Sequence, residues 1–180
     1  MTYVEYLASE RASDVRHEYL RGDVWAMAGG TPEHARLAAR VIGELGRQLE
    51  GKPCEPFSSD LRVRVVATDL STYPDVTVVC GELETAPEDA DAVVNPTVLV
   101  EVLSDGSEAY DRGEKFAHYR RLASLREYVL ISQHEPRVEV FRRRGEREWV
   151  FSEARAGETL RFSSLGVELA VDAVYRSRET

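Results

Sequence analysis

The chain has 180 residues, of which 43% are hydrophobic and 8% aromatic, and its formal net charge is −9. This composition is globular, and the length is that of one domain, which we expect to span residues 1–180. No apolar stretch approaches the roughly 20 residues that cross a bilayer, and the first residues lack a basic segment followed by an apolar one. We therefore expect a cytoplasmic protein with no membrane partner.

The negative charge argues against a surface that binds polyanions over its whole extent, since affinity for nucleic acid depends on Lys and Arg. Basic residues nevertheless outnumber acids between positions 112 and 147, which include the run Arg142-Arg143-Arg144. One basic face is compatible with this distribution. A charged strand edge, protected against pairing with other chains, explains the arginine run equally well.

The first part of the chain predicts two helices separated by a pair of strands. Residues 3–16 are typical of a short helix, and residues 18–27 of two strands joined by a turn. A second helix is predicted to begin with Thr31 as its N-cap and Pro32 in its first position, and to end at Gly51. Its apolar residues recur at helical spacing, which predicts a face turned to the core: Leu37, Val41, Leu45 and Leu49.

Four strands are predicted after this helix. They are the apolar segments 53–57, 61–66, 75–80 and 97–103. The segment 82–95 lies between the last two of them and contains a proline and many acids, which predicts a loop. The strands on either side of the loop are expected to meet as an antiparallel hairpin.

The remaining elements complete a mixed α and β chain. A turn precedes a predicted helix at 108–122, which places Asp111, Lys115 and Tyr119 at four-residue intervals along one face. Further elements are predicted as strands at 127–132, 138–142 and 149–153 and a short helix at 172–176. This order predicts the α/β (α+β) class, with a mixed β-sheet core flanked by helices and additional antiparallel strands.

The two cysteines, Cys54 and Cys80, can form only one bridge. Each lies in a predicted strand and neither has the spacing of a metal ligand. We therefore expect both to be reduced thiols packed among apolar neighbours.

An acid interrupts the most apolar of the predicted strands. Glu101 lies within Val98-Leu99-Val100-Glu101-Val102-Leu103, and an unpaired carboxylate in a buried strand is costly. If Cys80 lies opposite Pro96 in the hairpin, Asp75 lies opposite Glu101 and both side chains point to one face. Two carboxylates that close require either a shared proton or a divalent cation. We interpret the pair as a metal site, although a register shifted by one residue would place the two acids on opposite faces.

Lys115 is unusual because the chain has only two lysines among its 23 basic residues. It lies on the helix predicted to follow Glu101, one turn after Asp111. An ammonium group is compact and can change its pKa, which suits a catalytic cation. A simple ion pair with Asp111 explains the same spacing, and both interpretations stay open.

Several short motifs together resemble the Uma-two family of restriction-endonuclease-like proteins. They are Tyr73-Pro74-Asp75-Val76, Glu101-Val102-Leu103-Ser104, the helical set Asp111, Lys115 and Tyr119, Glu127-Tyr128, His17-Glu18-Tyr19-Leu20-Arg21-Gly22-Asp23, Met27 and Gly30-Thr31-Pro32-Glu33-His34. The resemblance extends from about Tyr3 to Val140. Any one of these motifs is weak, but as a set they are specific.

The resemblance implies the PD-(D/E)XK nuclease fold, in which two acids bind Mg²⁺ or Mn²⁺ beside a catalytic lysine. Here the acids would be Asp75 and Glu101, in agreement with the interpretation from the strands. The chain departs from the pattern at Leu103, where the family pattern has its lysine. Lys115 on the next helix is the candidate for that role.

The mechanism expected from these residues is metal-dependent cleavage of a phosphodiester. Asp75, Glu101 and the main-chain carbonyl of Val102 would hold the cation, and Glu18 would add a ligand directly or through water. Lys115 would orient or help to deprotonate the attacking water. Three further residues are expected to line the site: His34, Asp111 and Tyr119.

The expected partner is nucleic acid, with DNA as the substrate, and a homodimer would suit the cutting of both strands of a duplex. A different class of function stays open. The displaced lysine and the acidic charge balance also fit a binding or regulatory module that kept the fold and lost the chemistry. A metal-dependent hydrolase of a substrate other than nucleic acid is a third alternative.

Overall fold

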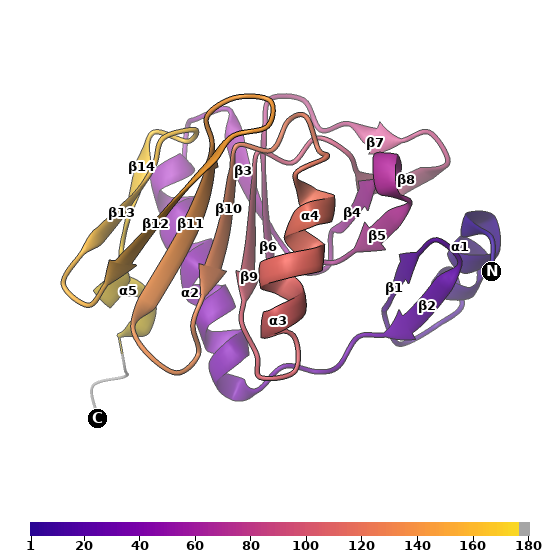
Figure 1. Ribbon diagram of the computed structural model, residues 1–180, viewed down its shortest axis with the longest axis horizontal. Helices are drawn as coiled ribbons and strands as arrows, with labels where there is room; N and C mark the ends of the chain where they lie inside the picture. The colour runs from indigo at the N-terminus through magenta and orange to yellow at the C-terminus, as the bar shows by residue number, and fades with distance from the viewer. Residues whose placement is uncertain (177–180) are drawn as a thin grey trace.

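A computed structural model describes residues 1–176 of the chain (Figure 1). Its helical elements are α1 (Tyr3–Arg11), α2 (Pro32–Leu49), the 3₁₀ turn η1 (Val66–Thr68), α3 (Glu108–Tyr110), the π-helical segment η2 (Asp111–Lys115), α4 (Phe116–Tyr119) and α5 (Val171–Tyr175). Its strands are β1 (His17–Leu20), β2 (Asp23–Ala26), β3 (Cys54–Ser58), β4 (Arg62–Val65), β5 (Leu70–Thr72), β6 (Val76–Cys80), β7 (Thr85–Ala86), β8 (Asp89–Val93), β9 (Val98–Val102), β10 (Glu127–Ile131), β11 (Arg137–Arg143), β12 (Trp149–Arg155), β13 (Thr159–Phe162) and β14 (Val167–Ala170). None of the described helices is both long enough and apolar enough to cross a membrane.

The central sheet is mixed, as the order of elements predicted. Its six strands run in the order β12-β11-β10-β9-β6-β3, and β9 and β10 are parallel while the other neighbours are antiparallel. In Figure 1, α2 lies behind this sheet and the α3–α4 segment lies in front of it. The chain therefore has a mixed α+β fold with helices on both faces of the core sheet.

The two faces of β9 pack against different layers because side chains alternate along a strand. Val98, Val100 and Val102 belong to the core that includes α2, whose predicted apolar face is buried as expected. Leu99 belongs to the other core, together with residues of α4 and β10. This alternation turns Glu101 toward the α3–α4 side.

A second sheet lies beside the first and was only partly predicted. Its six strands run in the order β2-β1-β5-β4-β8-β7. The prediction of a loop over residues 82–95 was wrong, because this segment contains β7 and the acidic strand β8. Asp89 of β8 is fully buried and accepts two hydrogen bonds of 2.8 Å from Arg62 of β4. That buried ion pair lets an acid-rich segment form a strand, and no local pattern indicates it.

The cysteines also differ from the prediction. Cys54 and Cys80 lie opposite each other on β3 and β6 and form a disulfide, rather than remaining reduced thiols. The prediction was wrong because the pairing of β3 with β6, which brings the two sulfurs together, cannot be read from the two strands separately.

This disulfide should contribute measurably to stability. It closes a loop with a sequence separation of 26, and the loss of such a link is expected to lower the free energy of unfolding by roughly 3 kcal/mol. Urea unfolding of the oxidised protein, of the protein in dithiothreitol and of Cys54→Ser/Cys80→Ser checks this. The last two samples should unfold together at lower urea, and three coincident curves would contradict the expectation.

Candidate active site

The register between β6 and β9 places the two predicted acids side by side. Val76 pairs with Val100 and Thr77 with Leu99, so that Asp75, just before β6, continues the ladder opposite Glu101. This is the register expected from the hairpin in which Cys80 lies opposite Pro96. Both residues line one cavity of about 380 Å³.

The same cavity gathers most of the residues expected at the site. Asp75 lies just before β6, and Glu101 and Val102 lie on β9. Other positions come from β1, the start of α2 and the α3–η2 segment. These additional lining residues include Glu18, His34, Asp111 and Lys115. Tyr119 does not line the cavity, but its hydroxyl donates a hydrogen bond of 2.8 Å to Oε1 of Glu101.

Lys115 is the centre of a buried group of three acids. Its Nζ lies 3.0 Å from Glu101 Oε1, 3.3 Å from Glu18 Oε1 and 3.6 Å from Asp111 Oδ1. The Lys115 side chain is only 7% exposed. The structure thus includes the ion pair with Asp111 that the spacing indicated, but as part of a larger buried cluster.

Burial and the neighbouring charges together set the pKa values of Glu101 and Lys115. Burial raises the pKa of Glu101 to about 8; Lys115 opposes the rise, while Asp111 and Asp75 add to it. Burial alone would lower the pKa of Lys115, but Glu101, Glu18 and Asp111 outweigh it and raise that pKa well above its usual value. The lysine is therefore a fixed cation at neutral pH, and Glu101 readily takes up a proton.

Asp75 is oriented by two neighbours. Its Oδ2 accepts a hydrogen bond of 2.7 Å from the main-chain N–H of Val102 and lies 3.2 Å from Nε2 of His34. The hydrogen bond to Asp75 is the main cause that raises the pKa of His34. His34 reaches this position because Thr31 caps the start of α2 by accepting a hydrogen bond from the His34 N–H.

Glu18 comes from the second sheet. It lies on β1, which pairs with β5, and the hydroxyl of Thr72 donates a hydrogen bond to Glu18 Oε1. The packing of the second sheet against the α3–α4 layer therefore brings an acid from the N-terminal region to Lys115. Nothing in the sequence indicated Thr72 as a neighbour of the site, since β5 itself was not predicted.

The segment that carries Asp111 and Lys115 is π-helical, whereas the sequence predicted one regular helix over 108–122. The hydroxyl of Tyr128 donates a hydrogen bond of 3.0 Å to the carbonyl of Asp111. A side chain that takes a carbonyl out of the regular ladder is a known cause of such a distortion, and π segments are frequent at functional sites.

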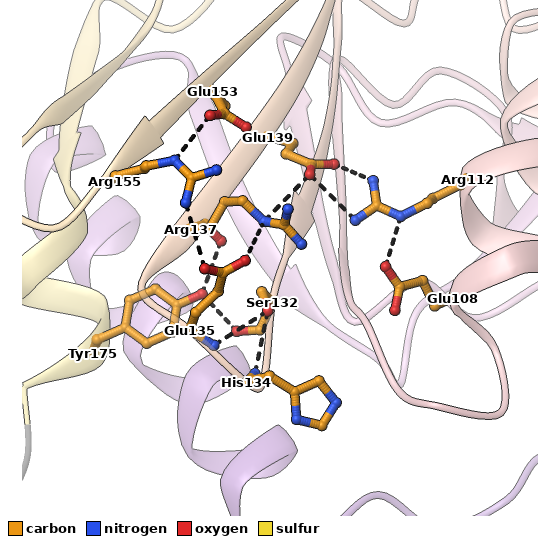
Figure 2. Close-up of polar contacts among 10 residues, drawn as sticks. All are labelled: Glu108, Arg112, Ser132, His134, Glu135, Arg137, Glu139, Glu153, Arg155 and Tyr175. Atoms are coloured by element: carbon orange, nitrogen blue, oxygen red, sulfur yellow. Dashed lines mark hydrogen bonds and ion pairs between the residues drawn. The ribbon is translucent and has the colours of Figure 1, made fainter.

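A polar network between η2 and strand β11 holds η2 in place (Figure 2). Arg112 donates to Glu108 at 2.8 Å and to Oε1 of Glu139 on β11 at 3.2 Å. Glu139 and Arg137 both lie on β11, 3.4 Å apart. The contact between Arg112 and Glu139 therefore joins η2 to the central sheet. Arg112 thus anchors η2 to β11 from a position between the two site residues Asp111 and Lys115, and it does not itself line the cavity.

One lining residue has no sequence signal at all. Gln133, just after β10, donates a hydrogen bond of 2.7 Å to the Leu103 carbonyl and accepts one of 2.7 Å from the Thr31 hydroxyl. It joins the end of β9 to the start of α2 and so couples the position of His34 to that of Glu101. Only the three-dimensional structure reveals this connection.

The donor set suits a hard cation. Carboxylate and carbonyl oxygens are the ligands that Mg²⁺ prefers, and Mg²⁺ commonly uses one or two carboxylates and keeps several waters. Among residues 1–176, no three His, Cys, Asp or Glu side chains are gathered into a group that could hold a metal by themselves. The residues therefore fit an ion held by Asp75, Glu101 and a main-chain oxygen with water completing its shell, but not a site with many protein ligands.

Tyr119→Phe tests the support of Glu101. The change removes only the hydroxyl that donates to Glu101 Oε1, and hydrogen bonds to buried charged groups contribute about 1.5–3 kcal/mol. We expect the free energy of unfolding to fall by about 2 kcal/mol in urea titrations at pH 8.5. Tyr175→Phe, which removes a hydroxyl bonded only to main-chain carbonyls, is the control for loss of a phenol without an effect on Glu101. A Tyr119→Phe variant that unfolds at the same urea concentration as wild type would contradict this account.

Comparisons with known proteins identify the family of the chain. A model of the Uma2 (Uma-two) family, described as "Putative restriction endonuclease", matches residues 3–172. The chain belongs to the Uma2 family. Family membership confirms the resemblance indicated by the sequence motifs and supports a nuclease.

Relatives and a solved structure extend the comparison over nearly the whole chain. Two uncharacterized proteins of Synechocystis sp. are similar to it: slr1290 is 34% identical over 172 residues, which are 96% of this chain and 90% of the relative. The other, sll1609, is 33% identical over 153 residues, or 85% of this chain and 86% of the relative. The crystal structure of a "putative nuclease belonging to DUF820" from Anabaena variabilis matches with a TM-score of 0.77 at 15% identity, covering 97% of this chain and 98% of that one. At that identity the structural match shows the Uma2 chain's fold alone.

Proposed function

We propose that this Uma2 chain is an endonuclease that depends on Mg²⁺ or Mn²⁺ and hydrolyses phosphodiester bonds of nucleic acid, with DNA as its substrate. The observation that carries the proposal is the convergence of Asp75 and Glu101 in one cavity beside the buried Lys115. Two carboxylates can hold a divalent ion that polarises a phosphodiester, and a nearby cation can offset charge that develops on the phosphate.

Each residue of the site has a role that follows from its chemistry. Asp75, Glu101 and the Val102 carbonyl would hold the ion, and Glu18 would contribute directly or through water. When bound, a divalent ion polarises a phosphodiester and lowers the pKa of a nearby water. Asp75 is already oriented for this by the Val102 N–H and by His34.

Lys115 is suited to one of the two roles considered for it. Because its pKa is raised, its ammonium stays protonated and can orient a water and offset negative charge that develops on the phosphate. To act as a base, Lys115 would need a lowered pKa instead of a raised one. The distance of 3.0 Å from Nζ to Glu101 also supports the idea that a lysine from the helix replaces the one missing at Leu103.

Incubation with supercoiled plasmid in Mg²⁺, Mn²⁺ or EDTA tests the proposal. We expect nicked and linear products with either metal and none with EDTA. Parallel reactions on a short RNA and on a small aryl phosphodiester determine the substrate class. DNA that is retained in a gel shift and never cut would instead favour a binding module without catalysis.

The form of the cleaved plasmid also tests the homodimer. A two-fold assembly presents two sites to the two strands of a duplex, so we infer a dimer that produces linear plasmid early in the reaction. Sedimentation equilibrium should give twice the chain mass. Only nicked circles, together with a monomer mass, would contradict this part of the proposal.

Metal affinity should depend on pH in a defined direction. The pKa of Glu101 is about 8 in the absence of metal, and a ligand must lose its proton before it binds. Affinity for Mn²⁺ should therefore rise by up to about tenfold per pH unit between pH 6.5 and 8 and then level off. Calorimetry in two buffers of different ionisation enthalpy should show proton release at pH 7. Constant affinity from pH 6.5 to 8.5 would contradict a role for Glu101 as a ligand.

A further inference from the structure

A cluster of arginines surrounds a hollow at the end of α4, away from the candidate active site. The hollow has a volume of about 700 Å³ and is lined by Arg120, Arg121, Arg126, Arg143, Arg144 and Arg147. The lining also contains one acid, Glu146. We call the six arginines the arginine surface, which is notable on a chain whose formal net charge is −9.

Arg143 builds this surface by joining two turns. Its guanidinium donates hydrogen bonds to the carbonyls of Arg120, Leu122 and Leu125 at 2.7–2.9 Å, and to that of Glu146 at 3.2 Å. The turn after α4 is thereby fastened to the β11–β12 turn, both at the upper end of the view in Figure 1. Arg143 is half-buried, whereas the other five arginines are exposed.

The five exposed arginines lack carboxylate partners within residues 1–176. Each of the arginines 120, 121, 126, 144 and 147 is absent from every ion pair that the described residues form. Exposed arginines elsewhere do pair with acids, as Arg16 does with Asp60 and Arg155 with Glu153. Burial lowers the pKa of Arg143, and the like charge of Arg126 lowers it further. Positive charge is therefore concentrated here without an internal counter-ion.

A second hollow continues the same surface. It has a volume of about 680 Å³ and shares Arg126, Arg143 and Arg144 with the first. Neither exposed aromatic rings nor a deep apolar slot lines the first hollow, so it offers no platform on which bases could stack. Exposed guanidinium groups suit phosphates, which they bind with two parallel hydrogen bonds.

We propose that the arginine surface binds the phosphate backbone of duplex DNA without regard to sequence and so holds the substrate of the Asp75–Glu101 cavity. This inference rests on the proposed function and adds a separate binding surface to it. Arg126 directly precedes Glu127, which pairs with Val98, whereas Glu101 pairs with Leu130. Arg126 thus lies four residues before the position level with Glu101, which is roughly 13 Å along the strands and about four nucleotide steps of one DNA strand.

Binding of a fluorescent duplex of about 25 base pairs, measured by anisotropy in EDTA over a range of salt concentrations, tests the surface. Arg126→Gln/Arg144→Gln should weaken binding roughly tenfold at moderate salt and reduce the slope of log K against log salt by about 2. The control Arg11→Gln/Arg47→Gln removes the same charge from side chains that are 62% and 66% exposed on α1 and α2. It should stay within about twofold of wild type, because long-range charge alone is screened. Equal losses in both variants, or no loss in either, would overturn the proposal.

The design separates this inference from the proposed function because no divalent metal is present. If the wild type binds DNA through Arg126 and Arg144 but never cleaves it, the surface stands and the endonuclease proposal fails. If it cleaves DNA and Arg126→Gln/Arg144→Gln binds and cleaves equally well, only the surface is refuted. Displacement of DNA by polyglutamate at equal charge concentration would identify an acidic polypeptide as the partner and also refute the surface.

Discussion

Asp75→Ala should abolish metal-dependent cleavage, with a loss of at least about a thousandfold in rate, because it removes one of the two carboxylates that would hold the ion. Asp75→Asn should be nearly as inactive, although its amide oxygen can still accept the hydrogen bond from the Val102 N–H. This second variant separates loss of metal binding from loss of structure. Plasmid nicking at several Mn²⁺ concentrations measures the effect.

Asp60→Asn is the matched control for this prediction. Asp60 is an acid in a turn with a side chain 74% exposed, paired with Arg16 on the surface. Its loss should leave cleavage within about twofold, since surface pairs contribute little. Full Mg²⁺-dependent cutting by Asp75→Ala, or an equal loss in Asp60→Asn, would refute the assignment of Asp75.

Lys115→Met is expected to have the largest effect on stability of any single change at the site. The change leaves Glu18, Glu101 and Asp111 buried together without their cation, and breaking a buried ion pair in this way costs about 3–5 kcal/mol. Cleavage should also fall by at least about a hundredfold, because no cation remains to offset charge on the phosphate. Urea unfolding and plasmid nicking measure the two effects separately.

The pH dependence of Lys115→Met has a definite sign. Without the ammonium, burial and mutual repulsion hold the pKa values of Glu101 and Asp111 above their unfolded values, as burial already does in the wild type. The folded state then binds more protons than the unfolded state, so stability must fall as pH rises from about 5 to 8. Lys115→Met/Glu101→Gln removes one of these acids and should recover part of the loss at pH 8. A variant as stable as wild type at pH 8 would mean that the cluster does not depend on this lysine.

The sequence was sufficient where local patterns and strand register determine the outcome. The four-residue spacing of Asp111, Lys115 and Tyr119 places all three near Glu101, even though the segment is π-helical in part. The pairing of Asp75 with Glu101 followed from one assumed register, which the structure confirms. A one-residue shift would have placed the two acids on opposite faces and removed the site.

The remaining features depend on contacts between distant segments. Strand β8 forms because Arg62 neutralises Asp89, and the disulfide forms because β3 and β6 become neighbours. Gln133 joins β9 to α2 through two hydrogen bonds that no motif marks. The grouping of the arginine surface likewise follows from Arg143 fastening two turns. Each of these is a tertiary contact, and a pattern read along one segment contains no information about it.

A crystal soaked in Mn²⁺ and measured for anomalous scattering would test the central claim most directly. We predict one strong peak within coordination distance of the Asp75 carboxylate, the Glu101 carboxylate and the Val102 carbonyl, and no peak at this position in Asp75→Asn. A well-ordered crystal at pH 8.5 with no manganese between these oxygens, or with manganese bound only elsewhere on the chain, would contradict it.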